Sequence, residues 1–288
     1  MRDVLEEPSA ATCVPTFLIN LDRSSDRLAR MQAEFSRAGM EFERLAAVDG
    51  TNLPDDHKPY FCDASGMIVS RLSPGEVGCY ASHIAVWKRI VAMGVPAALV
   101  CEDDAILADD LAQALDELLV VLPSGWDIIH LSQPPERAFK PLTPLMSGRT
   151  LIRHSRVPPS TAAYLISREG AAKMLKPAGP RRWAVDHDTR WPWLFGVDAY
   201  GVHPPLIRQR KDGSVIGPAH SRSRLRGGLR RSPFRTPASL MFNLRKLGPY
   251  WWVRCFVVNC GVKLRRMLRP VVRRVAHSAG LPLPERAG

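Results

Sequence analysis

Apolar positions in the first fifty residues switch between short continuous runs and helical periodicity. The run at 15–20 (PTFLIN) follows a proline and is typical of a buried strand. Four apolar side chains then share one helical face and end at Gly39, namely Leu28, Met31, Phe35 and Ala38. A second strand, closed by a turn, is predicted at 42–50 (FERLAAVDG). This strand–helix–strand opening predicts an α/β fold built on a parallel sheet.

The next helix has clear sequence boundaries. Ser73 can cap its N-terminus, and Pro74 suits its first position because the proline has no N–H to leave unpaired. Glu76 completes a capping box with Ser73. Gly94 is a typical stop signal, so we expect the helix to run to about Met93.

The pattern up to about residue 176 continues to alternate strand-length apolar runs with helical periodicity. Buried strands are predicted at 97–101, 126–131 and 162–167, and helices at 109–122 and 168–176. No internal repeat is evident. The sequence therefore predicts an α/β domain in which helices flank a mostly parallel sheet.

The composition changes at about residue 221. Residues 221–237 are rich in Arg, Gly, Ser and Pro, which is typical of a basic linker. From Arg208 to the end there are 19 Lys and Arg against two acids, a charge of +17, so the remainder carries 12 − 17 = −5. We expect a folded domain at 1–220 and a basic linker and tail at 221–288. Such a tail indicates an anionic partner, either phospholipid or nucleic acid.

The tail contains a candidate amphipathic helix at 250–277. Trp251 and Trp252 stand beside aliphatic residues and are followed by a basic half. This combination suits the surface of an anionic membrane. The most apolar part is short and contains Arg254 and Asn259, so we expect it to lie on a bilayer without crossing it. A core helix covering the first domain and a disordered basic tail are the other interpretations.

Cysteine usage and the N-terminal residues bear on localisation. The six cysteines are scattered and form no Cys-x-x-Cys, which suits free thiols in a reducing compartment. Residues 1–15 have neither the basic start nor the apolar centre of a signal peptide. We therefore expect a cytoplasmic protein that is peripheral on the inner, cytoplasmic face of the membrane.

Three consecutive acids, Glu102, Asp103 and Asp104, follow the apolar run at 97–101. Adjacent carboxylates repel one another, and burying them without a partner is costly. If the chain stays extended, Glu102 and Asp104 share one face and Asp103 points away. Ligands bind beyond the carboxyl ends of parallel strands, and two carboxylates there suit Mg²⁺ or Mn²⁺. An acidic loop that caps the next helix is the alternative.

Four blocks of the chain form a recognisable set, namely FLINLDRSSDRLARM, LSPGEVGCYASHIAVWKRI, ALVCEDDAIL and AAYLISREGAAKML. Together they resemble glycosyltransferase family 25. This family includes bacterial lipooligosaccharide galactosyltransferases and is related to collagen galactosyltransferases. The blocks occur in family order over roughly residues 14–217, and the tail beyond 221 lies outside the resemblance.

The resemblance implies a GT-A type fold and transfer of a hexose from a UDP-sugar, with galactose the expected sugar and inversion the expected outcome. It implies a divalent metal, Mn²⁺ or Mg²⁺, at Glu102, Asp103 and Asp104, which stand where such enzymes carry a DxD-like metal motif. The face argument favours Glu102 with Asp104 as the metal ligands and Asp103 beside the donor, but a bend at the end of the strand would substitute Asp103. The implied acceptor is a saccharide such as lipopolysaccharide, lipooligosaccharide or another cell-envelope glycan. Acceptors of this kind are anchored in the cytoplasmic leaflet, which gives the basic tail a reason to bind a membrane.

The resemblance also implies further site residues. Asn20, Asp22 and Arg27 follow the first strand, where such enzymes seat the nucleotide, and Ser82 and His83 belong to the Gly-Cys-x-x-Ser-His helix. An inverting displacement needs a base for the acceptor hydroxyl. Asp186 is the closer match to the family's aspartate, with Asp188 the other candidate. Weaker site candidates are His203, Gln209, Ser214 and His220.

Two other functions are open to the sequence. A nucleic-acid-binding protein could use the Arg-rich tail, but its tryptophans cluster with aliphatic residues and no reader motif is present, so no nucleic-acid partner is expected. An Mg²⁺-dependent phosphoryl-transfer enzyme could use the acids, but no Gly-x-x-x-x-Gly-Lys loop occurs.

Overall fold

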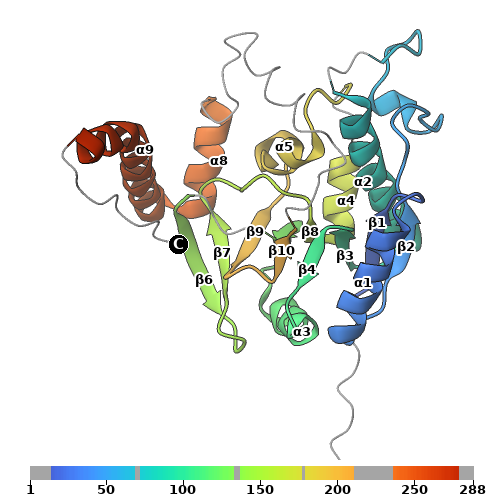
Figure 1. Ribbon diagram of the computed structural model, residues 1–288, viewed down its shortest axis with the longest axis horizontal. Coiled ribbons are helices and arrows are strands. Elements are labelled where there is room, and N and C mark those ends of the chain that lie inside the picture. Colours follow the sequence, from blue (N-terminus) through green and yellow to red (C-terminus); the bar gives the residue numbers. More distant parts are fainter. Residues whose placement is uncertain (1–13, 69–71, 133–136, 177–178, 211–235, 279–288) are drawn as a thin grey trace, which may run out of the picture.

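The computed structural model describes residues 14–68, 72–132, 137–176, 179–210 and 236–278 (Figure 1). Most of the predicted basic linker, together with the weak candidates Ser214 and His220, lies outside the described residues.

An eight-stranded sheet forms the centre of the described structure, in the order β2-β1-β3-β8-β5-β9-β7-β6. A second sheet pairs β4 with β10 in antiparallel fashion. The strands are β1 Thr16–Asn20, β2 Glu43–Ala46, β3 Ala97–Glu102, β4 Ala105–Leu107, β5 Ile128–His130, β6 Phe139–Pro144, β7 Thr150–His154, β8 Ala163–Ser167, β9 Ala199–His203 and β10 Ile207–Gln209.

The α/β class predicted from the sequence is confirmed. Strand β1 pairs in parallel with β2 and with β3, and β5 pairs in parallel with β9. Strand β8 lies between β3 and β5 and is antiparallel to both, and β7 is antiparallel to β9 and β6. The half of the sheet that carries the acid cluster is therefore the parallel one.

Helices cover both faces of the sheet and bury two separate apolar cores. Helices α1 (Ser25–Arg37) and α3 (Leu111–Val121) pack on one face, and α2 (Pro74–Met93) and α4 (Arg168–Leu175) on the other. Successive residues of β3 alternate between these cores, with Val100 in the α2 core and Cys101 in the α1 core. Glu102 continues this alternation toward the α2 side.

The predicted boundaries of α2 are confirmed. The Ser73 hydroxyl accepts a hydrogen bond from Glu76 N, and Ser73 N donates to Glu76 Oε2 at 2.7 Å. Gly94 ends the helix with φ 68°, in the left-handed region that favours glycine. A long, capped helix thus places its N-terminal turns at a fixed position beside the sheet.

The segment after residue 184 is helical and is interrupted before Pro192. It forms two short helices, α5 (Val185–Thr189) and α6 (Pro192–Phe195). Pro192 starts α6 because a proline cannot supply the N–H that would continue α5. The N-cap of α5 is Ala184, so Asp186 lies in the first turn and does not cap the helix.

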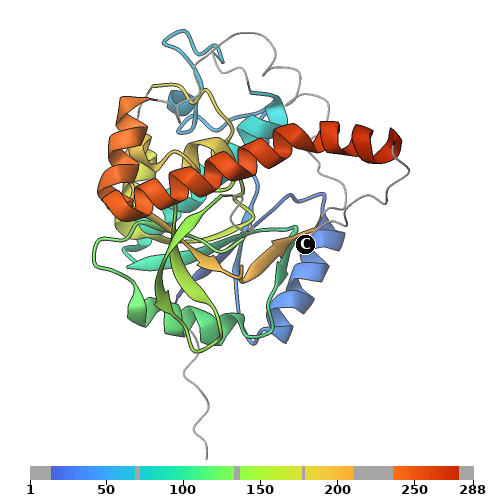
Figure 2. The ribbon, with the colours of Figure 1, turned by 90° about the vertical axis from the view of Figure 1, so that its left-hand side faces the viewer.

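Helices α8 (Pro237–Leu247) and α9 (Pro249–Ser278) pack against the edge of the sheet (Figure 1). Asn259 of α9 accepts a hydrogen bond from Ala138 N at 2.9 Å and donates one to Ser155 Oγ at 3.0 Å. Figure 2 shows α9 lying across the side of the molecule formed by β6 and β7. Within the described residues, we find no helix with the length and hydropathy needed to span a bilayer.

The face of α9 turned away from the sheet carries exposed apolar side chains. Its members recur at helical spacing and are 48–62% exposed; we call Val253, Val257, Leu264 and Leu268 the outer stripe. Trp251 and Trp252 are half-buried, so the exposed apolar surface of α9 consists of the outer stripe together with Tyr250, Phe256 and Val258. The proposed boundary between domains at residue 220 stays a prediction.

Candidate functional site

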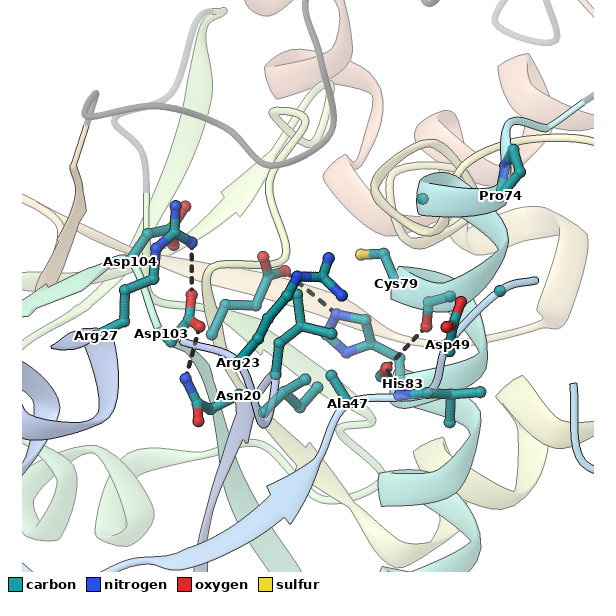
Figure 3. Close-up of a pocket in the computed structure, with 18 of the residues that line it drawn as sticks. Asn20, Arg23, Arg27, Ala47, Asp49, Pro74, Cys79, His83, Asp103 and Asp104 are labelled. Atoms are coloured by element: carbon teal, nitrogen blue, oxygen red, sulfur yellow. Dashed lines mark hydrogen bonds and ion pairs between the residues drawn. The ribbon is translucent and has the colours of Figure 1, made fainter. Parts of the chain in front are cut away.

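A cavity of about 470 Å³ opens at the carboxyl ends of β1 and β3 (Figure 3). Its walls are the segment 19–27, the loop 47–51, the first turns of α2 and the acids 102–104. In open α/β sheets this is the edge where ligands bind. Of the residues predicted for the site, seven line this cavity, namely Asn20, Arg27, Ser82, His83, Glu102, Asp103 and Asp104.

The middle acid, Asp103, is fully engaged by the neighbouring elements. Asn20 Nδ2 donates to its Oδ2 at 2.8 Å, and Arg27 Nη1 contacts its Oδ1 at 2.9 Å (Figure 3). Arg44 Nε donates in turn to Asn20 Oδ1 at 3.0 Å. Both oxygens of Asp103 therefore tie the acid cluster to β1 and α1.

Glu102 has one oxygen held and one open. Its Oε1 accepts from Thr161 Oγ1 at 2.6 Å and lies 3.2 Å from His83 Nε2. Burial opposes ionisation, but the hydrogen bonds from His83 and Thr161 hold the pKa of Glu102 below its ordinary value. Within the described residues no hydrogen bond engages Oε2, which leaves that oxygen for a ligand.

A buried chain of hydrogen bonds fixes the orientation of the His83 ring. Trp87 Nε1 donates to the Tyr164 hydroxyl at 2.9 Å, and that hydroxyl lies 2.8 Å from His83 Nδ1. Burial raises the pKa of Tyr164 well above its ordinary value, so its hydroxyl keeps its proton. With a neutral His83 ring, that hydroxyl donates to Nδ1 because Trp87 can only donate to Tyr164, and Nε2 then carries the ring proton and donates to Glu102.

Asp104 is the second acid with an open oxygen. Gln209 Nε2 donates to its Oδ2 at 2.8 Å, whereas its buried Oδ1 has no hydrogen-bond partner among the residues that the structure describes. Burial, followed by the charge of Glu102, raises the pKa of Asp104 to about 6. An orphaned buried oxygen beside a second carboxylate fits a divalent cation, which would remove their repulsion.

The pairing of Glu102 with Asp104 arises from a turn and not from strand alternation. Strand β3 ends at Glu102, and Asp103 and Asp104 form a turn before β4. The condition for the predicted alternation, an extended chain through residue 104, is therefore not met. The three acids differ in role because each has different hydrogen-bond partners.

The two other residues predicted for the donor site, Ser82 and Asp22, differ in their surroundings. Ser82 Oγ accepts from Val48 N at 2.8 Å and donates to Gly78 O at 2.7 Å, so it fastens the loop 47–51 to α2. Asp22 is 80% exposed, pairs with Arg44 and does not line the cavity. Asp22 could still meet a ligand that extends beyond the cavity.

The candidate base Asp186 lies in the first turn of α5 and does not line the cavity. Burial raises its pKa, and the charge of Glu102 acts in the same direction. Asp188, by contrast, is buried against α2, where it accepts a hydrogen bond from Tyr80 at 2.9 Å. Its surroundings are those of a structural residue, which leaves Asp186 as the candidate base of the two.

Of the two weak candidates that lie in the described residues, one belongs to the site and the other does not. Gln209 belongs to the site, since it holds Asp104. His203 packs its ring against Phe139, with centroids 5.0 Å apart, and does not line the cavity.

Several residues of the site were not selected from the sequence. Arg23 and Cys79 line the cavity, and Thr161 holds Glu102. The signal for Arg23 and Cys79 was available, since both stand inside the family-like blocks. Thr161 had none, because only the antiparallel pairing of β8 with β3 brings it to the acids.

Comparison with known proteins finds matches to one family of glycosyltransferases. The profile of Glycosyltransferase family 25 (LPS biosynthesis protein) matches residues 13–189, which is more than half of the chain. Procollagen galactosyltransferase 1-A of Xenopus laevis is 31% identical over 175 residues, covering 55% of this chain and 27% of that protein. Inactive glycosyltransferase 25 family member 3 of Mus musculus is 30% identical over 179 residues, covering 55% and 28%.

These matches cover less than a third of the length of either relative. Among solved structures, a glycosyltransferase involved in glycosylation of the major capsid of PBCV-1 aligns with a TM-score of 0.41 and 8% identity, covering 70% of this chain and 94% of that one. That likeness is too distant to carry an argument.

Proposed function

Because the chain belongs to glycosyltransferase family 25, we propose that it transfers a hexose, most simply galactose, from a UDP-sugar to a saccharide acceptor. The helix-flanked α/β sheet agrees with the GT-A type fold of such enzymes. The observation that carries the proposal is the pair of carboxylates, Glu102 and Asp104, which both line the cavity, each with one oxygen held by the protein and one without a hydrogen-bond partner among the described residues.

The open oxygens of Glu102 and Asp104 would hold Mn²⁺ or Mg²⁺. A divalent cation there supplies Lewis-acid stabilisation of the charge that develops on a leaving diphosphate. The protein keeps both carboxylates aimed by hydrogen bonds from Thr161, His83 and Gln209. Such partners commonly tune metal affinity as well as orientation.

The rest of the cavity suits the nucleotide. Arg23 and Arg27 provide positive charge on one wall, and the loop 47–51 and the glycine-rich start of α2 form the opposite wall. The pyrophosphate of a UDP-sugar would lie between the arginines and the acids. Asp103 positions Arg27 for this task through their ion pair at 2.9 Å.

Asp186 is the proposed base for the acceptor hydroxyl. Single displacement with inversion needs a carboxylate on the acceptor side of the donor. The raised pKa of Asp186, which burial causes, makes it a stronger proton acceptor than an exposed aspartate. The transition state resembles an oxocarbenium ion, as in glycoside hydrolysis, so a carboxylate nearby also stabilises positive charge.

The proposed acceptor is a cell-envelope glycan on a lipid carrier, such as lipopolysaccharide or lipooligosaccharide. Support comes from the description of the family and from the outer stripe of α9, which has the apolar character of a membrane-contacting surface. On this proposal the protein works in the cytoplasm, peripherally on the inner membrane, with α9 against anionic lipid.

A donor screen tests the central proposal. The full chain is incubated with Mn²⁺ and individual UDP-sugars, and release of UDP is measured in wild type, Asp104→Asn and Asp109→Asn. Asp109 is a matched control because it is 84% exposed and pairs with Arg37 outside the cavity. We expect one UDP-sugar to be hydrolysed slowly by wild type and Asp109→Asn, and at least about 100-fold more slowly by Asp104→Asn.

The proposal is wrong if no nucleotide sugar is bound or hydrolysed by wild type. It is also wrong about the site if Asp104→Asn matches wild type. Because an inactive relative exists in this family, binding of each UDP-sugar is measured by calorimetry alongside turnover.

A further inference from the structure

The wall of the cavity contains a second set of metal donors that differs in chemistry from the acid pair. We propose that Cys79, His83 and Glu102 form a site for a thiophilic divalent cation of the Zn²⁺ class. The site shares Glu102 with the oxygen-only pair proposed above, so the two cations compete. The inference concerns binding alone and does not require that the chain transfer a sugar.

The geometry of α2 and β3 assembles these donors. Cys79 and His83 are four residues apart on α2 and therefore face the same direction, toward the cavity (Figure 3). Glu102 reaches them from the end of β3. The three ligand atoms all lie within 4.8 Å of one another.

One of these separations already matches a tetrahedral zinc site. His83 Nε2 lies 3.2 Å from Glu102 Oε1. Two ligands at about 2.0 Å from a tetrahedral Zn²⁺ are about 3.3 Å apart. The Cys79 sulfur lies within 4.8 Å of the other two ligand atoms and lines the cavity.

Donor chemistry separates the two sites. A thiolate, an imidazole and one carboxylate suit Zn²⁺ or Co²⁺, whereas carboxylates, waters and phosphates suit Mg²⁺ and Mn²⁺. Glu102 is common to both sets. The thiophilic cation would use Oε1 of Glu102 and the harder cation its Oε2, so two cations bound at once would repel each other across a single carboxylate, and this repulsion makes their binding competitive.

The surroundings of His83 can support coordination through Nε2. A ligating histidine usually donates its other ring N–H to a protein acceptor. The Tyr164 oxygen, 2.8 Å from Nδ1, is that acceptor once the ring proton moves from Nε2 to Nδ1. The exchange costs the hydrogen bond that Tyr164 donates in the free protein. The Cys79 thiol releases one proton to solvent, and His83 stays neutral.

Cobalt spectroscopy tests the site directly. Co²⁺ is titrated into the full chain without nucleotide, and the near-ultraviolet thiolate-to-cobalt charge-transfer band is recorded for wild type, Cys79→Ser and Cys62→Ser. Cys62 is a free, half-buried cysteine outside the cavity and is the matched control. We expect the band at one equivalent in wild type and Cys62→Ser, and its loss in Cys79→Ser.

Two further measurements extend the test. Tyr164→Phe removes the acceptor for Nδ1 and should weaken cobalt binding about 10- to 100-fold while the band keeps its shape. Added Zn²⁺ should release bound Mn²⁺ from wild type, seen as the signal of free Mn²⁺ in electron paramagnetic resonance, and should do so only at higher concentration in Cys79→Ser.

Absence of the band in wild type, or its persistence in Cys79→Ser, overturns the proposal. Circular dichroism and the thermal midpoint of each variant establish folding. If Cys79→Ser does not fold, His83→Gln replaces it, and retention of full cobalt affinity by that variant overturns the proposal equally. A protein that binds cobalt through Cys79 but releases no UDP would contradict only the transferase proposal.

Discussion

The three adjacent carboxylates of the acid cluster have different surroundings although they are the same kind of group. Asp103 is held through both oxygens by Asn20 and Arg27, whereas Glu102 and Asp104 each keep one oxygen open. A carboxylate saturated by protein donors positions its neighbours, and one with an orphaned oxygen can bind a cation. The hydrogen-bond partners of each carboxylate, more than its residue type, therefore determine whether it positions a neighbour or can bind a cation.

A second group of residues with unpaired polar atoms lies outside the cavity. His130 and His154 project from β5 and β7, with ring centroids 6.3 Å apart, and His154 occupies the space that Gly201 leaves by having no side chain. Nε2 of His130 and both ring nitrogens of His154 have no hydrogen-bond partner in the part of the chain that is described. Burial lowers the pKa of His130 to about 4 and that of His154 to about 3.

These histidines predict a loss of stability in acid. Below pH 6.5 the unfolded chain protonates them and the folded chain does not, so their contribution to the free energy of unfolding falls as the pH falls toward about 4. His154→Leu removes one such site and should reduce the loss between pH 7 and pH 5 by roughly 2 kcal/mol. Urea denaturation at each pH measures this difference from wild type.

Buried carboxylates act in the opposite direction; burial raises the pKa of Asp188 to about 6, for example, so its contribution to the free energy of unfolding grows as the pH falls. Wild type and His154→Leu share these carboxylates, so the difference between the two proteins reports on His154 alone. Between pH 7.5 and 9 the free energies of unfolding of the two proteins should differ by a constant amount. Parallel curves from pH 7 to pH 5 would show that His154 is protonated in the folded protein.

Helices and strands can be predicted from the sequence where the residues that define their ends lie within or beside the element itself. The cap of α2 and the glycine that ends it lie within the helix's own segment, and both are confirmed. Strand β6 was missed because Pro141 and Pro144 interrupt its pattern, which its edge position tolerates. Strand β7 was missed because Arg153 and His154 hide a buried strand behind polar side chains.

The candidate site shows the same limit. Asn20, Arg27 and the acids could be chosen because each stands in a sequence block of the family. Thr161 and Tyr164 could not, because their roles depend on β8 pairing with β3. The choice of Glu102 and Asp104 as the open carboxylates also depends on Gln209, which is distant in sequence and arrives through β10.

The contact between α2 and the loop 47–51 gives a test at this scale. A Cβ on residue 78 would lie 2.6 Å from Val48 O and 2.8 Å from Gly50 N, both backbone atoms that cannot turn aside. Gly78→Ala should therefore destabilise the fold by about 1–3 kcal/mol and weaken UDP binding, although alanine normally favours a helix. Denaturant midpoints and calorimetry with UDP measure the two effects.

Gly261→Ala is the matched control, since it too is a helical glycine but has no atom within 4 Å of the added Cβ. It should be neutral or stabilising by up to about 1 kcal/mol. Equal effects of the two substitutions would mean that the loop does not rest on α2 in solution.

The C-terminal part of the molecule combines positive charge with an exposed apolar stripe. The chain from Arg208 onward carries +17 and the remainder −5. Cys255 and Asn259 turn one side of α9 toward the sheet, which leaves the outer stripe facing solvent. A stripe of valine and leucine on a basic segment has the two attractions that bind a peripheral protein to anionic lipid, burial of apolar area and charge.

The outer stripe predicts vesicle binding that one substitution can weaken. Val257→Asp places a carboxylate in the stripe and should reduce sedimentation with anionic phospholipid vesicles about tenfold or more, because it removes apolar burial and adds repulsion. Val120→Asp is the matched control, since Val120 is an 86% exposed valine on α3. It should sediment like wild type, and salt should weaken binding of both. Equal sedimentation of Val257→Asp and wild type would contradict the membrane proposal, and salt-dependent binding to DNA without vesicle binding would favour a nucleic-acid partner instead.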